Sequence, residues 1–169
     1  GLARSHALVA AGRYDVALAI AEPLLDQART VGWPALIADA GAHVGYPLEK
    51  LGRFEEAEAA LSDAYFEAVK SETWDTAAEA ATKLVFVVGY RRANGEAGKQ
   101  WGRHADAAID LLGESKHGLR RAWLLNSLGA VNIRMGDYKE AQAVLARALM
   151  IRETALGTAH PDVSDSLNN

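Results

Sequence analysis

The sequence has no cysteine, only four prolines and two methionines among its 169 residues, and aromatic residues make up 7% of it. Without cysteine the chain cannot form a disulfide framework, a thiolate zinc site or a cysteine nucleophile. It also has no uninterrupted apolar run of about 18 to 20 residues, the length that a membrane-spanning helix needs. These absences favour a soluble protein of the cytoplasm that makes no use of a membrane.

The sequence also has no cationic surplus. Its 18 Lys and Arg residues are outnumbered by 22 Asp and Glu residues, which gives a net charge of -4. Proteins that bind nucleic acid through the phosphate backbone normally present an excess of positive charge. We therefore do not expect nucleic acid to be a partner.

Catalytic and metal-binding motifs are missing as well. The segment Gly98-Lys99-Gln100 is similar to the end of a phosphate-binding loop, but Ala93 stands where that loop needs a glycine and Gln100 where it needs Ser or Thr. The sequence has no kinase HRD or DFG triplet and no Gly-x-Ser-x-Gly elbow. No two histidines are spaced as metal ligands on one helix face; they are His6, His43, His104, His117 and His160. We expect no catalytic residue, no metal and no cofactor, and therefore no enzyme activity.

Alanine, in contrast, is abundant. The chain contains 34 alanines, about one residue in five. Alanine has the highest intrinsic helix propensity and is much less common in ordinary proteins. The composition therefore predicts an all-α fold.

A short motif recurs along the chain. A glycine is followed by Arg or Asp, then by an aromatic residue, and an alanine lies three residues after the aromatic. A glycine at a helix end can adopt the left-handed conformation that stops the helix, and the aromatic residue can then pack between that helix and the next. The copies are Gly12-Arg13-Tyr14, Gly52-Arg53-Phe54, Gly136-Asp137-Tyr138 and a weaker Gly102-Arg103-His104.

A second set of glycines lies inside the predicted helices. Gly45 and Gly129 each precede one of these turns by seven residues, and Gly89 is the matching residue of the unit between them. Their spacings of 44 and 40 residues are typical of a repeat of two helices. Glycine at these places, together with alanine on the second helix, would let the two backbones approach closely.

The periodicity predicts helices near residues 2–11, 14–31, 34–51, 54–72, 75–94, 98–112, 118–135 and 138–156, with a ninth beginning at 161. Pro34 and Pro161 fall in first helical turns, where proline is tolerated. Pro23 and Pro47 fall inside helices, so we expect a kink or a break at each.

These residues resemble the tetratricopeptide repeat. The motif runs Leu128-Gly129, Gly136, Tyr138, Ala141, Leu145 and Ala148-Leu149, and is repeated as Val44-Gly45, Gly52, Phe54, Ala57, Leu61 and Ala64. The segment 148–169 looks like the longer repeats of kinesin light chains and of bacterial regulatory proteins. Two departures stand out: Ser5 replaces the inner glycine of the first unit, and the insertion 93–98 should make the third unit irregular.

The resemblance implies an α-solenoid of antiparallel helix pairs wound into a right-handed superhelix. It divides the chain into one array with units at about 1–33, 34–74, 75–117 and 118–157 and the start of a fifth at 158–169. Because both ends are abrupt, we expect the chain to be a fragment of a longer protein. Exposed ends of such a solenoid would also favour self-association.

A solenoid of this type presents the first helix of each pair on its concave face. We expect a protein or peptide ligand to bind there, on aromatic and polar side chains that form the groove. The candidates are Asp39, Tyr46, Lys50, Lys83, Phe86, Tyr90, Trp123, Asn126 and Arg134. Phe86 and Trp123 suit packing between repeats equally well, and the sequence leaves both roles open.

The function implied for the chain is therefore a non-catalytic interaction scaffold. An alternative is that it forms the sensor or substrate-docking region of a bacterial Ser/Thr protein kinase, a signalling ATPase or a transcription regulator. In that case the catalytic domain would lie outside these 169 residues. The adjacent pairs Arg91-Arg92 and Arg120-Arg121 could meet an acidic ligand, although a solvated face with salt bridges is the simpler interpretation.

Overall fold

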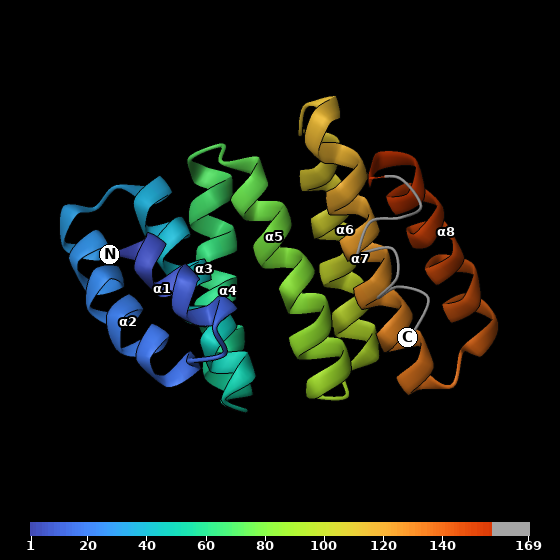
Figure 1. Cartoon of the computed structure of the whole chain (residues 1–169), viewed down its shortest axis with the longest axis horizontal. Coiled ribbons are helices and arrows are strands. Elements are labelled where there is room, and N and C mark those ends of the chain that lie inside the picture. The colour runs from blue at the N-terminus through green and yellow to red at the C-terminus, as the bar shows by residue number, and fades with distance from the viewer. Residues whose placement is uncertain (157–169) are drawn as a thin grey trace.

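The computed structural model describes residues 1–156, apart from the side chains of residues 114–116, and every regular element in that range is helical (Figure 1). The expected ninth helix and the start of a fifth unit lie outside the described residues. The elements are α1 (Leu2–Ala10), α2 (Tyr14–Val31), α3 (Pro34–Lys50), α4 (Phe54–Lys70), α5 (Trp74–Leu84), η1 (Val85–Arg91), α6 (Gly95–Asp110), α7 (Glu114–Met135) and α8 (Tyr138–Leu156).

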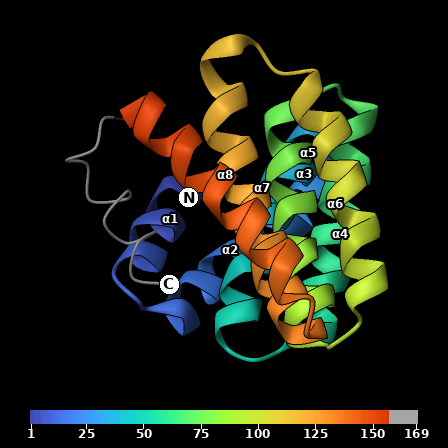
Figure 2. The same ribbon diagram turned by 90° about the vertical axis from the view of Figure 1, so that its right-hand side faces the viewer.

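The helices follow one another along the long axis of the molecule in chain order, from α1 and α2 at one end to α7 and α8 at the other (Figures 1 and 2). Each packs against the next helix in the chain, and α3 also contacts both α1 and α5, while α5 contacts α7. The odd-numbered helices therefore form one row and the even-numbered helices cover it. This is the arrangement of an all-α helical repeat solenoid, as the sequence predicted.

Alanine forms much of the core. Among the described residues seventeen alanines are buried, including Ala17, Ala57 and Ala141 of the recurring motif, and the largest fully buried side chains include Leu61, Leu84 and Ile109. Small side chains at the contacts let the helices pack closely, and the fewer large ones fill the spaces that remain. The alanine-rich composition is thus a consequence of close helix packing.

The inner glycines lie where two helices meet. A Cβ atom on Gly45 would lie 2.4 Å from Leu61 Cγ on α4, and one on Gly129 would lie 2.6 Å from Leu145 Cδ2 on α8. At the ends of their helices, Gly52 and Gly136 have φ values of +78° and +83°, in the left-handed region that glycine alone adopts readily. Both predicted uses of glycine are confirmed at these positions.

The first pair departs from this pattern in a specific way. Ser5 is fully buried at the position of the inner glycine, and its hydroxyl donates a hydrogen bond to the carbonyl oxygen of Ala17 at 3.0 Å. A hydrogen bond therefore joins α1 to α2 at this place. The turn aromatic of the last pair also differs, because the side chain of Tyr138 is 69% exposed rather than packed between helices.

The third pair is irregular, as expected, but not in the predicted form. The helix predicted over 75–94 is split into α5 and the π-helical segment η1, and α6 begins at Gly95, so the connection is shorter than the expected insertion. Gly89 of η1 lies directly against Gly98 of α6, where an added Cβ on Gly98 would be 2.5 Å from the Gly89 Cα. Gly89 makes this contact from within the π-helical segment.

One further expectation was wrong, and the break expected at each internal proline is not found. Gly102-Arg103-His104 is not a turn, because all three residues lie inside α6 and Gly102 packs closely against Leu128 of α7. Neither internal proline breaks its helix: α2 continues past Pro23 and α3 past Pro47, and Pro47 is fully buried.

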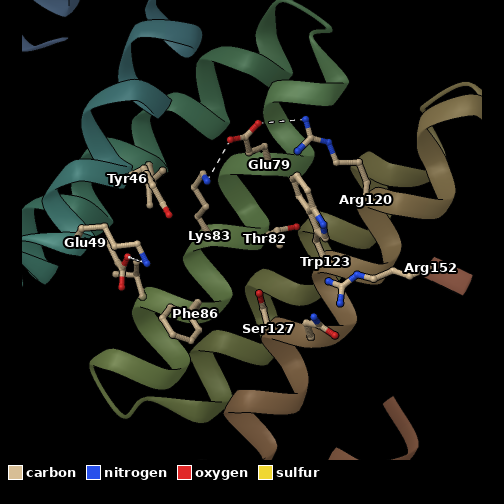
Figure 3. A pocket seen from close by; sticks show the side chains of 14 residues that line it. Tyr46, Glu49, Glu79, Thr82, Lys83, Phe86, Arg120, Trp123, Ser127 and Arg152 are labelled. Carbon is tan, nitrogen blue, oxygen red and sulfur yellow. Dashed lines mark ion pairs between the residues drawn. The ribbon is translucent and has the colours of Figure 1, made fainter. Parts of the chain in front are cut away.

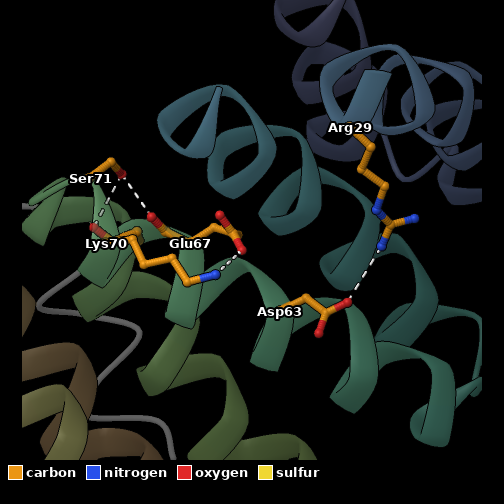
Figure 4. A network of polar contacts seen from close by, with 6 residues as sticks. Arg29, Asp63, Glu67, Lys70 and Ser71 are labelled. Atoms are coloured by element: carbon orange, nitrogen blue, oxygen red, sulfur yellow. Dashed lines mark hydrogen bonds and ion pairs between the residues drawn. The ribbon is translucent and has the colours of Figure 1, made fainter. Parts of the chain in front are cut away.

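Ion pairs connect successive pairs of helices. On the outer row, Arg29 of α2 lies 3.4 Å from Asp63 of α4, whereas Lys70 and Glu67, 2.6 Å apart, form an ion pair within α4 (Figure 4). Similar links join Arg92 to Glu58 and Lys99 to Asp137. Of the described helices, none has the length and apolar character needed to cross a membrane.

Candidate functional site

A pocket of about 260 Å³ opens on the row of odd-numbered helices (Figure 3). Its lining comes from four successive elements of that row, α3, α5, η1 and α7, with single residues from α4 and α8. The lining residues are Tyr46, Glu49, Lys50, Leu61, Glu79, Thr82, Lys83, Phe86, Val87, Arg120, Trp123, Asn126, Ser127 and Arg152. Side chains more than a hundred residues apart in the chain, such as Tyr46 and Arg152, therefore form one surface.

Three aromatic side chains form the walls of the pocket. Tyr46 comes from α3, Phe86 from η1 and Trp123 from α7, and Trp123 is 48% exposed. The ammonium of Lys83 lies 4.2 Å from the centre of the Tyr46 ring, a cation-π contact between neighbouring helix pairs. The exposure of Trp123 means that this residue is not part of the core between repeats.

One edge of the pocket carries a charged cluster centred on Glu79. Its carboxylate lies 3.2 Å from both Lys83 Nζ and Arg120 Nη2, and Arg120 reaches on to Asp75 at 2.7 Å. Burial alone would raise the pKa of Glu79, but the charges of Lys83 and Arg120 outweigh burial and lower it. Glu79 is therefore ionised at neutral pH and holds both cations in place.

The opposite edge is organised around Glu49. This carboxylate is only 5% exposed and pairs with Lys50 at 3.1 Å and with Arg91 of η1 at 2.9 Å. Burial works to lower the pKa of Lys50, but its contacts with Glu49 outweigh burial and raise it. Each carboxylate of the pocket is thus in contact with two cations.

Neutral polar groups form the floor. Thr82 and Ser127 lie between Phe86 and Trp123 (Figure 3), and Thr82 is only 9% exposed. No described residue makes a hydrogen bond to the Thr82 hydroxyl. Beside them the carboxamide oxygen of Asn126 accepts hydrogen bonds from both terminal nitrogens of Arg152, at 2.7 and 2.6 Å, in the amide orientation that satisfies both groups.

A second depression of about 500 Å³ continues from the first along η1 and α7. Phe86 and Tyr90 stack there with ring centres 4.9 Å apart, and Arg91 lies over the Phe86 ring at 5.0 Å. The guanidinium of Arg134 lies 5.4 Å from the centre of the Tyr90 ring, although Arg134 does not line the depression itself. Aromatic and cationic side chains alternate along this part of the surface.

A third depression, of about 360 Å³, extends the surface toward α1. Asp39 lines it together with His43, whose Nδ1 lies 2.9 Å from the carbonyl oxygen of Asp39. Tyr46, Lys83 and Trp123 line both this depression and the pocket. The three hollows are therefore parts of one continuous groove.

The structure brings most of the predicted residues together. Six of them line the pocket, Asp39 and Tyr90 line its two extensions, and Arg134 lies beside Tyr90; the six are Tyr46, Lys50, Lys83, Phe86, Trp123 and Asn126. Whether these side chains bind a ligand stays a prediction.

Several pocket residues were not anticipated. Glu79 precedes Lys83 by one helical turn, so helical spacing could have found it. Arg120 was considered only as a contact for an acidic ligand, although it precedes the predicted Trp123 by three residues. Glu49 and Thr82 directly precede the predicted residues Lys50 and Lys83 in the sequence, but they are more buried than these lysines. Arg152 belongs to α8, on the other row, and no local pattern indicates that it reaches the groove.

The paired arginines form salt bridges, as the simpler interpretation expected, but these bridges are less solvated than predicted. Arg120 and Arg121 have side chains only 17% and 21% exposed, and Arg121 pairs with Asp106 and Asp110 of α6. Across the described residues, no group of three or more His, Asp or Glu side chains is placed to hold a metal ion.

Comparison with known proteins adds one finding. Residues 121–162 match the model of a family described as Tetratricopeptide repeat, and no curated protein matches the chain. The match covers most of α7, all of α8 and their connection, which includes Gly129 and Gly136. The kinase association that the resemblance suggested stays a hypothesis. Residues 121–162 are thus similar to a tetratricopeptide repeat, and the consecutive helix pairs before them have the arrangement of an all-α helical repeat.

Proposed function

We propose that the chain is a scaffold that binds an extended segment of a partner protein along its groove. Tetratricopeptide repeats generally mediate protein–protein interactions and are generally not catalytic. The observation that carries the proposal is the continuous surface formed by Tyr46, Phe86 and Trp123, which come from three successive helix pairs. Aromatic side chains of this kind supply much of the binding energy at protein interfaces.

The size of the groove favours an extended peptide. Its three hollows measure about 260, 360 and 500 Å³ and share lining residues, so a chain could place successive side chains in them. Separate hollows of this size suit individual side chains better than one continuous helix face. The polar groups between the hollows can pair with the backbone of the bound segment.

The test is a peptide-binding measurement with matched variants. Fluorescently labelled peptides selected from an array are titrated with the wild-type chain, with Trp123→Ala and with Phe86→Ala. Each variant should weaken binding about tenfold or more, since truncating a central aromatic anchor typically has this effect. Phe66→Ala is the control, because Phe66 is a 54% exposed aromatic residue of α4 outside the groove. Equal binding by all four proteins would refute the proposal.

A further inference from the structure

We infer that the groove selects a segment that carries a basic residue at one end and an acidic residue at the other. Asp39, at the end of the groove nearest α1, would pair with the basic residue. Arg134, beside the opposite end, would pair with the acidic residue. This selection rests on the proposed function and adds to it the charge pattern of the partner segment.

The three hollows of the groove follow one another in a fixed order. The pocket of about 260 Å³ shares Tyr46 and Trp123 with the hollow toward α1, and it shares Phe86 and Ser127 with the hollow along η1 and α7. Among the described residues, none lines both outer hollows. The pocket is therefore the middle of the groove, and the two outer hollows are its ends.

Asp39 provides an accessible negative charge at the first end. Its side chain is 52% exposed and lines the hollow toward α1. His43 Nδ1 lies 2.9 Å from the carbonyl oxygen of Asp39 and 3.6 Å from its carboxylate. Because a carbonyl oxygen only accepts hydrogen bonds, this contact needs a proton on Nδ1, which the neutral ring supplies. No Lys or Arg in the described part of the chain pairs with the carboxylate, so it can take a cation from the ligand.

Arg134 provides an accessible positive charge at the other end. It lies in the last turn of α7 and is exposed. Its guanidinium lies 5.4 Å from the centre of the ring of Tyr90, which lines the hollow along η1 and α7. A contact with a ring leaves the N–H donors of a guanidinium available to a carboxylate. Across residues 1–156, no Asp or Glu with a described side chain pairs with Arg134.

The lysine, arginine and glutamate side chains that line the two end hollows are already paired. Lys83 and Glu79 line the hollow toward α1 and lie 3.2 Å apart. Arg91 lines the opposite hollow, with its guanidinium 2.9 Å from the carboxylate of Glu49. Opposite charges in such close contact largely cancel at a distance. Each end therefore offers one charge to a ligand, and the two charges are opposite.

These two charges favour one pattern of ligand charges. An ion pair between exposed side chains changes affinity by about threefold, and a like-charge contact costs a similar factor. A segment with one basic and one acidic residue can match both ends, whereas a segment with two like charges matches one end and is repelled at the other. Matching both ends should therefore improve affinity about tenfold over matching one.

The experiment titrates the chain with four labelled peptides that differ only at two positions. These positions hold Lys and Glu, Glu and Lys, two Lys or two Glu, and the constant residues are those of a peptide that binds the wild-type chain. Trp123 and Arg134 are 11 residues apart on α7, roughly 16 Å, which an extended chain spans with about five residues. The two positions are therefore placed about five to eight residues apart in separate sets of peptides with acetylated and amidated ends.

In at least one set, a mixed peptide should bind about tenfold more tightly than both peptides with like charges. The two orders of Lys and Glu are both included because the direction of the bound backbone is not assumed. Measurement at pH 8 keeps ordinary histidine side chains neutral, so that they add no charge. The difference between the peptides should shrink at high salt.

Charge-reversal variants assign the preference to the two ends. Asp39→Lys makes both ends positive and should prefer the peptide with two Glu, whereas Arg134→Glu makes both ends negative and should prefer the peptide with two Lys. The double variant keeps the net charge of -4 and should again prefer a mixed peptide. Asp39→Asn and Arg134→Gln each remove one charge and should weaken the preference without reversing it.

Matched reversals outside the groove control for the net charge. Asp15→Lys in α2 and Arg103→Glu in α6 change the net charge by the same amounts, at exposed positions that line none of the three hollows. Both should keep the wild-type preference for a mixed peptide. Because all four substituted positions are exposed, thermal melts of the variants should stay close to that of the wild type.

The outcomes separate the charge selection from the function on which it rests. Equal binding of the four peptides in every set, with binding still weakened by Trp123→Ala, overturns the charge selection and leaves the scaffold function intact. A preference that Asp39→Lys and Arg134→Glu change no more than the control variants do overturns the roles of these two residues. Binding that is insensitive to both Trp123→Ala and Phe86→Ala overturns the proposed function itself.

Discussion

The guanidinium of Arg120 lies 2.7 Å from the carboxylate of Asp75, although 45 residues separate them in the chain. The contact joins the first helix of one pair to the first helix of the pair before it. Arg120 also pairs with Glu79 and lies 5.3 Å from the centre of the Trp123 ring. One side chain therefore contributes to both the spacing of the helices and the shape of the pocket.

Replacing this arginine should destabilise the fold. Its side chain is 17% exposed, so Arg120→Ala removes a partly buried cation from Asp75 and from Glu79, which keeps only Lys83, and we expect a loss of about 2 kcal/mol. Urea unfolding followed by circular dichroism measures the change. Arg29→Ala is the matched control, since this residue also links two pairs but is 49% exposed, and it should cost less than about 1 kcal/mol. Equal losses of unfolding free energy in the two variants would show that burial of the ion pair does not change its contribution to stability.

The contact between Gly98 and Gly89 should be intolerant of any side chain. An added Cβ would meet backbone atoms that cannot rotate away, so Gly98→Ala should destabilise the chain by about 1 to 3 kcal/mol. Gly118→Ala in α7 is the control, because its Cβ would have an ordinary contact of 3.7 Å and alanine is the better helix former. Thermal melts of the two variants should therefore shift in opposite directions.

Substitution of Gly129 tests the close contact between α7 and α8. Gly129→Val should overpack α7 against Leu145 of α8 and cost about 1 to 3 kcal/mol. Gly129→Val combined with Leu145→Ala should recover part of this loss, because the smaller residue leaves space for the larger one. The melting temperatures of the single and double variants give the coupling. An unchanged melting temperature in the single variant would contradict the observed packing.

The lowered pKa of Glu79 predicts a dependence of stability on pH. The group has an ordinary pKa of 4.5, and its value is lower in the folded chain, so the unfolded state takes up a proton first as the pH falls. The stabilisation from Glu79 is present above about pH 4.5 and is lost below it. Urea midpoints measured from pH 3 to 7 should therefore fall less steeply at the acid end for Glu79→Gln than for wild type. If plots of the urea midpoint against pH ran parallel for the two proteins, the ionised form of Glu79 would not be stabilised by Lys83 and Arg120.

The buried hydrogen bond of the first pair can be tested by Ser5→Ala. Loss of the bond to the Ala17 carbonyl oxygen should cost about 1 kcal/mol. Thermal unfolding measures the change, and Thr30→Ala, which removes an exposed hydroxyl bonded within α2, is the control. A Ser5→Ala variant as stable as wild type would show that shape alone fills this position.

Sequence patterns predicted the helices well, because the signals that define them are local. Apolar periodicity and the glycines that end helices gave boundaries within a few residues for α2, α3, α7 and α8. The inner glycines were found for a related reason, since each marks a contact with the next helix in the chain. The same glycine-based pattern failed at Gly102, because a glycine before a basic and an aromatic residue also suits close packing inside a helix.

The parts that could not be predicted depend on distant partners. The π-helical turn of η1 reflects where Gly89 must lie to contact Gly98, which no local pattern encodes. The pairing of Arg91 with Glu49 spans 42 residues, and the approach of Arg152 to the pocket depends on how α8 lies over α7. The groove was therefore predicted as a set of exposed residues, but its charged edges and polar floor were not.

The links between successive helix pairs also bear on how a ligand would be held. Because Glu49 ties α3 to η1 and Arg120 ties α7 to α5, these ion pairs oppose a change in the width of the groove. A groove that is already ordered loses little conformational entropy on binding, so more of the free energy of each contact contributes to affinity. The same ion pairs favour ligands that fit the groove at its present width, because widening it would separate them.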